Sequence, residues 1–412
     1  MDEAGDNITG SHISRRDFLN MGVLGLASIA TGKKLVNTIN YLADALGDKV
    51  EESGINNKLH EVLKIVQENS KMIVNFSDKY GIPPEVLATV VSMEHLIILT
   101  GKTKKDGYAI GISESDSIKG FTDLIEKEIH PDKANIGLCQ VNLQDAINFE
   151  DRLVGKDAFP DADKQKREQT TYERLESPWW NMVYFSEMLK KEAADTGKTI
   201  TDKQAATQFI REKYNDDSHK LKIFNELLDV YSNFFQDKKP DEKFKRCSLE
   251  EAISVWNEYP EYSHLFRSVW PVEYFVVHHT AGKYHTESII TAEHIAKGFG
   301  DIGYNGIIGN GELTSDGKFY PGRSTKKEGA HTLSYNKKSI GVALVGDFNI
   351  TEPTTLQLDS LRKAIIASSA IYEIDPFKVV GHRELNDTQC PGNNFTTDKF
   401  KRPVDVAAGK IV

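Results

Sequence analysis

Cysteine is scarce in this chain, which has three such residues among 412. Three thiols cannot form the disulfide network that stabilises small secreted domains, so each domain must depend on a hydrophobic core. We predict that Cys139 and Cys247 are free thiols, with a bridge between them as the alternative. The third cysteine, Cys390, lies in a motif that also contains a histidine.

Long hydrophobic runs, basic runs and internal repeats are also absent. The apolar stretch near the N-terminus, residues 21–30, is shorter than the roughly 20 residues that a transmembrane helix needs. The net charge of −10, without a basic run, argues against a nucleic-acid partner. Hydrophobic residues make up 39% and charged residues 27% of the chain, which is typical of soluble globular proteins. A chain of 412 residues is long enough for two or three domains.

The N-terminal segment resembles a twin-arginine export signal. Arg15 and Arg16 are followed by Phe18, Leu19 and the short apolar stretch 21–30. We therefore predict a signal over residues 1–32, export by the twin-arginine machinery and a location outside the cytoplasm. Cleavage is expected after Ala30, or alternatively after Ala45. The competing interpretation is the start of an ordinary amphipathic helix.

In the rest of the chain, the pattern of apolar residues changes at a charged segment. Residues 33–70 predict a helical spacer, and residues 71–236 have apolar residues at helical spacing. Residues 237–247 are charged and lack apolar periodicity, which indicates an exposed linker. Residues 248–412 alternate between strand and helix patterns. The expected fold class is therefore multidomain, with an α domain followed by an α/β domain.

Individual elements can be predicted in residues 248–412. Strands are expected at residues 274–277, 306–308, 318–320, 340–345 and 377–380. Helices are expected at residues 248–257, 291–297 and 356–372, the last capped by Thr354 or Thr355. Helices should cover both faces of a mixed sheet.

Three side chains in this α/β region form a candidate metal site. His278 ends a strand-like run, and His382 and Cys390 follow the strand-like residues 377–380. Two imidazoles and a thiolate suit Zn²⁺, and three protein ligands leave the fourth position open for water or substrate. The spacing alone is a weak signal, because many long chains contain such pairs.

Four ordered stretches around these residues strengthen the prediction. They are Val-Val-His-His-Thr-Ala at 276–281, Asp-Ile-Gly-Tyr-Asn at 301–305, Gly-Ala-His-Thr at 329–332 with 339–348, and Gly-His-Arg through Cys-Pro-Gly at 381–392. Together they resemble the zinc-dependent N-acetylmuramoyl-L-alanine amidases related to phage T7 lysozyme and peptidoglycan recognition proteins. The resemblance implies that His278, His382 and Cys390 hold Zn²⁺, and that peptidoglycan is the partner.

The resemblance also implies a mechanism. Tyr304 falls on the position of the family's catalytic tyrosine, which stabilises the oxyanion, and Thr388 is a candidate second donor. Some relatives carry a glutamate in the strand that matches 340–345, where this chain has Ala343 and Val345. A general base is therefore not evident, and zinc-bound hydroxide together with Tyr304 should carry more of the proton transfer.

Other polar residues near these motifs have alternative interpretations. Successive strand residues point to opposite faces, so only one of His278 and His279 can face the metal, and the resemblance favours His278. His331 is predicted to contact substrate, with a hydrogen-bonded structural role as the alternative. Asn305 is a candidate for substrate binding or for fixing its loop. His285 and His294 are expected at the surface.

The helical region resembles the lysozyme-like fold of lytic transglycosylases. The resemblance rests on a helix ending at Glu94, a Gly-Leu-x-Gln turn at 137–140, a Pro-x-x-Asn segment at 178–181 and Tyr-Asn at 214–215. It implies that Glu94 is the general acid, because an apolar environment raises the pKa of a carboxylic acid. Gln140 and Tyr214 are the implied glycan contacts.

Two features of this helical resemblance remain open. A true lysozyme needs a second carboxylate, for which Asp106, Glu114 and Asp116 are candidates. Relatives usually follow the glutamate with serine, whereas this chain has His95. A domain that only binds glycan is the alternative to a glycosidase.

The sequence thus predicts an exported peptidoglycan hydrolase that combines a zinc amidase with a glycan-cleaving or glycan-binding helical domain. Three alternatives remain for the α/β region. They are a module that binds peptidoglycan without cleaving it, a zinc peptidase acting on stem peptides, and a structural zinc site.

Overall fold

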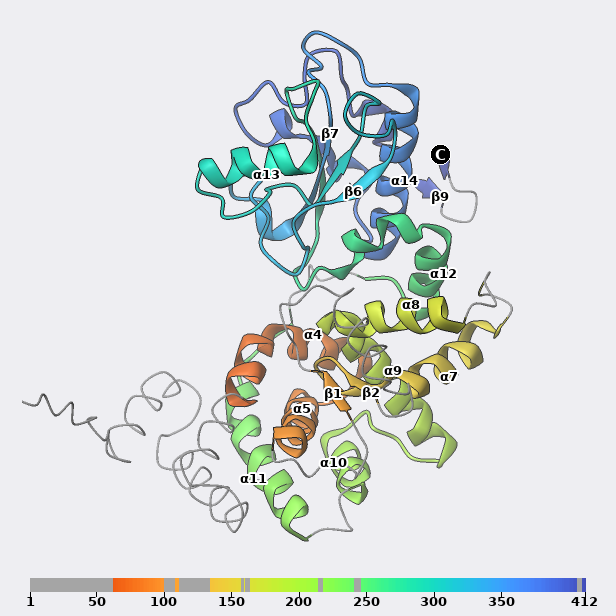
Figure 1. Ribbon diagram of the computed structural model, residues 1–412. Helices are drawn as coiled ribbons and strands as arrows, with labels where there is room; N and C mark the ends of the chain where they lie inside the picture. The colour runs from red at the N-terminus through yellow and green to blue at the C-terminus, as the bar shows by residue number, and fades with distance from the viewer. Residues whose placement is uncertain are drawn as a thin grey trace, which may run out of the picture. The chain divides into compact units, whose positions relative to one another are not determined.

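The structure is a computed structural model that describes residues 62–99, 108–110, 134–156, 159, 164–213, 218–240, 246–405 and 410–412 (Figure 1). The expected signal, residues 1–32, and the first part of the expected spacer lie outside the described residues. Among the helices described, none combines the length and apolar character needed to cross a membrane.

The chain divides into two compact units. We call Met1–Asp106 with Lys190–Pro240 the helical unit, and Gly107–Leu189 with Asp241–Val412 the sheet unit. The expected helical domain 71–236 is therefore shared between the two units.

The helical unit contains α4 (Ser70–Tyr80), α5 (Pro84–Leu99), α10 (Lys203–Glu212) and α11 (Ser218–Phe235). Helix α5 begins at Pro84, whose fixed φ suits a first turn, and it packs against α11, where Ser92 Oγ and Tyr231 OH are 2.6 Å apart. The prediction that Glu94 ends this helix is wrong. The helix continues to Leu99 because no glycine or proline follows Glu94 before Gly101.

The first part of the sheet unit contains helices and a small sheet. Its elements are β1 (Tyr108–Ile110), β2 (Ala134–Ile136), β3 (Val141–Asn142), α7 (Leu143–Val154), α8 (Lys164–Glu176) and α9 (Pro178–Asp195). Three of the helices are joined by a buried ion pair: Glu150 of α7 accepts hydrogen bonds at 3.0 Å from Arg174 of α8, and Tyr184 of α9 donates to the same carboxylate. Removing Glu150 would leave the buried charge of Arg174 uncompensated, so this network holds the helices together.

The second part of the sheet unit is built on a five-stranded sheet of order β6-β5-β7-β4-β8. The strands are β4 (Tyr274–His279), β5 (Gly306–Ile308), β6 (Phe319–Pro321), β7 (Ser339–Leu344) and β8 (Val379–Gly381). All neighbours are parallel except β5 and β6. This mixed α/β architecture confirms the fold class predicted for residues 248–412.

Helices α13 (Glu287–Ala296) and α14 (Thr355–Tyr372) lie on either side of these strands, and α12 (Leu249–Glu258) packs along α14 (Figure 1). Ile290 of α13 packs with Ile307 and Val345 in a buried cluster. On α14, Gln357 Nε2 donates hydrogen bonds to the carbonyls of Ile308 (3.2 Å) and Val345 (2.9 Å). Polar and apolar contacts therefore attach the two helices to the sheet.

The predicted elements occur close to their expected bounds, with two informative differences. Helix α13 begins at Glu287, before the expected residue 291, because Thr286 caps it by accepting a hydrogen bond from the Ile289 amide. Strand β8 begins at Val379 because Asp375 caps a short 3₁₀ turn over Pro376–Lys378. Thr354 caps α14 and forms a capping box with Gln357. Of the two predicted caps, Thr354 and Thr355, the structure therefore has Thr354.

The prediction that residues 237–247 form an exposed linker is wrong at Arg246. The described residues 237–240 are exposed, but Arg246 is 5% exposed. Its guanidinium lies 4.0 Å from the Tyr372 ring centroid and donates to the carbonyls of Ser268 (2.8 Å) and Trp270 (3.0 Å). A guanidinium can be buried here because it stacks on an aromatic ring while its Nη2 group donates to two carbonyls. Cys139, Cys247 and Cys390, all within the described residues, form no disulfide, as predicted for Cys139 and Cys247.

Candidate metal centre

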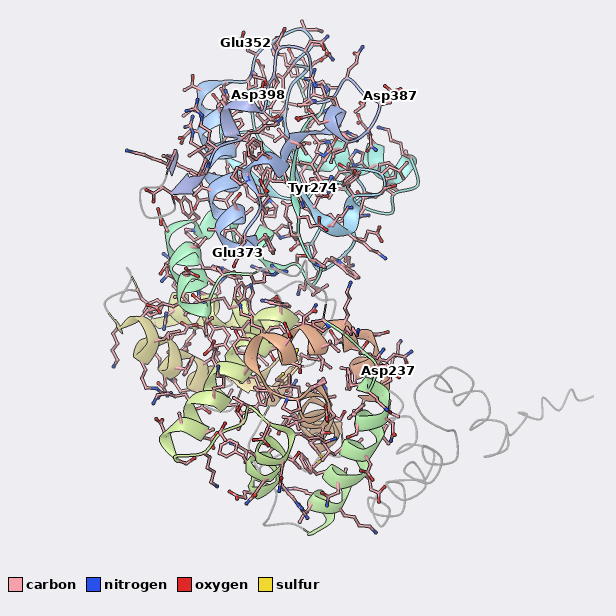
Figure 2. The ribbon with its side chains drawn as sticks, turned by 180° about the vertical axis from the view of Figure 1, so that it is seen from behind. Asp237, Tyr274, Glu352, Glu373, Asp387 and Asp398 are labelled. Carbon is pink, nitrogen blue, oxygen red and sulfur yellow. The ribbon has the colours of Figure 1, made fainter. Side chains whose placement is uncertain are left out.

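Strand topology brings the three predicted metal ligands together. His278 lies near the end of β4, and His382 follows β8, which pairs with β4 in parallel so that Val277 faces Gly381. The carboxyl ends of parallel strands meet at one edge of a sheet, where α/β proteins form their sites. Asp387, in the loop between His382 and Cys390, lies at the surface of the unit, far from Tyr274 at the other end of β4 (Figure 2).

The donor atoms of His278, His382 and Cys390 all lie within 4.8 Å of one another. Cys390 Sγ is 3.6 Å from His278 Nδ1. Zn–S and Zn–N bonds of ordinary length at a tetrahedral angle would place these atoms about 3.6 Å apart. The donor set and the spacing therefore both fit Zn²⁺.

Burial controls the protonation of the ligands. It holds the pKa of His278 well below its usual value, with help from His331 and His382, so the imidazole is neutral and able to ligate a metal. Burial also raises the pKa of the Cys390 thiol to about 11, although the His279 amide and Arg383 oppose this shift. Without a metal the thiol is therefore protonated, and metal binding requires release of that proton.

The loop from residue 382 to 392 is held by its own residues. The Arg383 amide donates to the Cys390 carbonyl at 2.8 Å, and the Arg383 guanidinium donates to the carbonyls of Gly392 and Phe395. Glu384 accepts hydrogen bonds from the Gly381 amide (2.7 Å) and from Thr397 (2.8 Å). These contacts fix both ends of the loop that carries His382 and Cys390.

Thr388 lies within the same loop. Its Oγ1 accepts a hydrogen bond from the Cys390 amide at 3.3 Å, and its side chain is partly exposed. The accepting role leaves the hydroxyl proton of Thr388 available to another acceptor.

His331 and Thr332 lie against the second nitrogen of His278. His278 Nε2 is 3.2 Å from His331 Nδ1 and 3.4 Å from Thr332 Oγ1. Polar partners on the second nitrogen fix the ring orientation and tautomer of a metal-binding histidine. His331, the predicted substrate contact, thus lies where it can orient His278, a candidate metal ligand, which agrees with its alternative hydrogen-bonded structural role.

His279 faces away from the triplet. Its Nδ1 accepts a hydrogen bond from the Phe348 amide at 3.2 Å, and its ring packs on Phe348. The alternation of β4 therefore separates the two adjacent histidines as expected. Ala343 in β7 and Val345 just beyond the strand are both completely buried, and neither side chain is titratable.

Tyr304 lies beside the triplet. Its ring centroid is 5.1 Å from that of His278, and burial raises the pKa of its hydroxyl above the usual value. The hydroxyl therefore stays protonated at neutral pH. Among the described residues it has no hydrogen-bond partner, which leaves it free to donate to a substrate.

Asn305 fixes the Tyr304 loop to the sheet. Its Oδ1 accepts from the Gly341 amide at 2.9 Å, and its Nδ2 donates to the Arg323 carbonyl at 3.1 Å. The residue is 2% exposed, so both ends of the amide are engaged inside the protein. This geometry matches loop fixing, one of the two roles considered for Asn305.

His294 corrects the expectation of a surface histidine. It is 6% exposed, its Nδ1 accepts from the Gly303 amide at 2.8 Å, and its ring lies 5.2 Å from the Tyr304 ring. The helical pattern of α13 does not reveal this burial, because the covering residues come from the loop ahead of Tyr304. His285 is partly buried and lies 3.4 Å from Glu293.

The residues proposed for glycan recognition are only partly described. Gln140 is buried with a left-handed backbone (φ 51), and its Nε2 donates to the Gly137 carbonyl at 2.6 Å. Asn181 ties the same turn to α9, because its Nδ2 donates to the Ile136 carbonyl (2.6 Å) and its Oδ1 accepts from the Cys139 amide (2.6 Å). Two of the resembling motifs therefore meet in space.

Glu94 is partly buried on α5. Tyr214 and the possible second carboxylates, Asp106, Glu114 and Asp116, lie outside the described residues.

Comparisons with known proteins concern the sheet unit. Residues 269–393 match the family described as N-acetylmuramoyl-L-alanine amidase. Peptidoglycan-recognition protein SC2 of Drosophila simulans is 35% identical over 134 residues, covering 30% of this chain and 70% of the relative. The N-acetylmuramoyl-L-alanine amidase of Homo sapiens is 36% identical over 99 residues, 24% of this chain and 16% of the relative. Among solved structures, the amidase LysC of Clostridium intestinale URNW is 30% identical, covering 32% of this chain and 84% of its own, with a TM-score of 0.30.

Proposed function

Because this chain belongs, through residues 269–393, to the N-acetylmuramoyl-L-alanine amidase family, we propose that it hydrolyses the amide between N-acetylmuramic acid and L-alanine in peptidoglycan. The observation that carries this proposal is the convergence of His278, His382 and Cys390 beside Tyr304. Zn²⁺ is the cofactor that these donors fit, and when bound it supplies a Lewis acid for the carbonyl and lowers the pKa of water.

The chain's own residues stabilise the charge that develops during amide hydrolysis. The Tyr304 hydroxyl donates a hydrogen bond to the scissile carbonyl oxygen as it becomes an oxyanion, and Thr388 supplies a second donor. His331 and Thr332 keep the His278 ring oriented through Nε2. Burial keeps Tyr304 protonated at neutral pH, so the donor needs no proton from solvent.

Mass spectrometry of digested peptidoglycan tests the activity. The zinc-loaded protein should release stem peptides that begin with L-alanine, and a chelator or Cys390→Ser should abolish the release. Cleavage within the stem peptide would indicate a zinc peptidase instead. Binding without any soluble product would indicate a recognition protein that does not cleave.

We further propose that the helical region cleaves the glycan strand with Glu94 as the general acid. The proposal is supported by the position of Glu94, which is partly buried on the apolar helix α5. The Glu94→Gln protein should lose glycan products while it keeps amidase products. Anhydro-muramic ends from the wild type would indicate a lytic transglycosylase, and reducing ends a lysozyme-type hydrolase. Intact glycan with wild-type protein would indicate a binding role.

Export by the twin-arginine route is the matching proposal for location. It is supported by Arg15, Arg16 and the apolar stretch 21–30. Replacing both arginines with lysine should retain the protein inside the cell, as measured by fractionation, whereas unchanged export would contradict the proposal.

A further inference from the structure

The backbone of Arg323 supports the loop that carries Tyr304. The Arg323 amide donates to the Tyr304 carbonyl at 2.7 Å, and the Arg323 carbonyl accepts from Asn305 Nδ2 at 3.1 Å. The same carbonyl accepts a second hydrogen bond, at 3.2 Å, from His264 Nε2. A carbonyl oxygen has two lone pairs, so its accepting capacity is fully used. The backbone of one residue, Arg323, thus links Tyr304 to His264.

His264 lies outside the residues that match the amidase family. It belongs to the 3₁₀ helix η3 (Pro260–Arg267), whereas the match begins at residue 269. A second contact comes from Thr325, which is 3% exposed and whose Oγ1 donates to the His264 carbonyl at 3.1 Å. The side chain and the backbone of His264 therefore both hold the segment 323–325.

Helices α8 and α9 hold η3 in turn. Arg267 of η3 pairs with Glu173 of α8 at 2.8 Å, and Trp180 of α9 donates to the Phe266 carbonyl at 2.9 Å. Lys326, next to the supported segment, lies 3.4 Å from Glu176 of α8. The four charged side chains are 8–22% exposed, so water replaces these contacts less easily than those of an exposed pair. The C-terminal end of α8 therefore anchors both η3 and the segment 323–326.

We propose that His264 is a positioning residue for Tyr304, and that Glu173 and Glu176 hold the two supporting segments in register. Amidase activity would then require residues of α8 that lie outside the amidase family region. The kinetic part of this inference rests on the proposed function. His264 acts through Arg323, and a displacement of about 1 Å at a catalytic group can cost on the order of 100-fold in rate.

Two substitutions at position 264 separate positioning from folding. His264→Leu removes the N–H donor and should lower kcat roughly tenfold with KM within about twofold, whereas His264→Gln can still donate and should keep most of the activity. In a Tyr304→Phe chain, His264→Leu should cause little further loss, because both changes act on the same hydroxyl. An unchanged kcat in the His264→Leu variant would overturn the proposal. So would a loss of kcat on adding His264→Leu to the Tyr304→Phe chain that equals its loss in the wild type.

Hydrogen–deuterium exchange gives a readout that needs no substrate. Peptides that contain Tyr304 and Arg323 should exchange faster in His264→Leu and in the double variant Glu173→Gln, Glu176→Gln. Glu168→Gln on the same helix is the control, because its partner Lys164 is 75% exposed. Unchanged exchange in the double variant would overturn the role of α8. If the wild type lacks amidase activity but the variants exchange faster, the proposed function fails and the structural inference stands.

Discussion

Gly341 of β7 lies directly against the ring of His331: a Cβ at position 341 would be 2.4 Å from His331 Nδ1. The same Nδ1 lies 3.2 Å from His278 Nε2. The absence of a side chain at position 341 therefore creates the space in which His331 reaches His278, a candidate metal ligand.

Gly341→Ala should displace His331 and weaken the support of His278. Because such orienting partners contribute about 10–100-fold to metal affinity or activity, we expect a zinc-affinity loss of this order. Competition with a chromophoric chelator measures it. In a His331→Ala chain the ring is gone, so Gly341→Ala should add little. Equal losses in both backgrounds would contradict the steric explanation.

Cys390→Ser should lower zinc affinity by at least about 100-fold, since a neutral hydroxyl is a poor substitute for a thiolate. Cys247→Ser is the matched control, because Cys247 is also a largely buried free thiol but lies outside the triplet. Metal content after dialysis against a weak chelator compares the two proteins. Retention of zinc by the Cys390 variant would remove the thiol from the site.

Tyr304→Phe should lower kcat for stem-peptide release by about 100–1,000-fold, the usual effect of losing one oxyanion donor. Zinc affinity should stay within about threefold, because the hydroxyl is not one of the clustered donor atoms. Turnover and metal titration of the same preparation test both parts. Normal turnover would exclude the proposed role.

His264 should make stability depend on pH. Burial lowers the pKa of His264 from 6.5 to about 4, so the unfolded chain binds this proton more readily than the folded chain. The contribution of neutral His264 to the free energy of unfolding is complete above pH 6.5 and is lost as the pH falls toward 4. At pH 4.5 the lost free energy is about 2–3 kcal/mol. Urea unfolding at pH 7 and pH 4.5 should show that His264→Gln loses less stability than the wild type. Equal losses would contradict this assignment.

Arg246→Ala should destabilise the sheet unit by about 2–4 kcal/mol, because it removes a ring contact and leaves the buried Ser268 carbonyl without the Arg246 donor. Lys238→Ala, at an exposed position, is the control and should change stability by less than about 0.5 kcal/mol. The shift in the urea midpoint distinguishes them. Equal effects would show that the burial of Arg246 does not matter energetically.

Much of the sheet unit could be predicted because its signals are local. The apolar run before His278, the Thr354 capping position and the spacing of His382 and Cys390 are readable from neighbouring residues. The parallel pairing of β4 with β8 brings His278, His382 and Cys390 together, as a set of candidate metal ligands requires.

Other features depend on residues that are distant in the sequence. The local pattern gave no sign that His294 accepts from the Gly303 amide or that Arg246 stacks on Tyr372. The end of α5 was misplaced because a functional motif was used to set a helix boundary, although the following residues continue the helix.

The sequence by itself determined the amidase family, the three candidate metal ligands and the order of strands and helices, because these follow from short motifs and from hydrophobic periodicity. Only the tertiary structure decided that His331 orients His278 and that His264 reaches the Arg323 carbonyl. A buried polar side chain needs a partner, and here the partner lies 53 or 59 positions away along the chain, beyond the range of any local pattern.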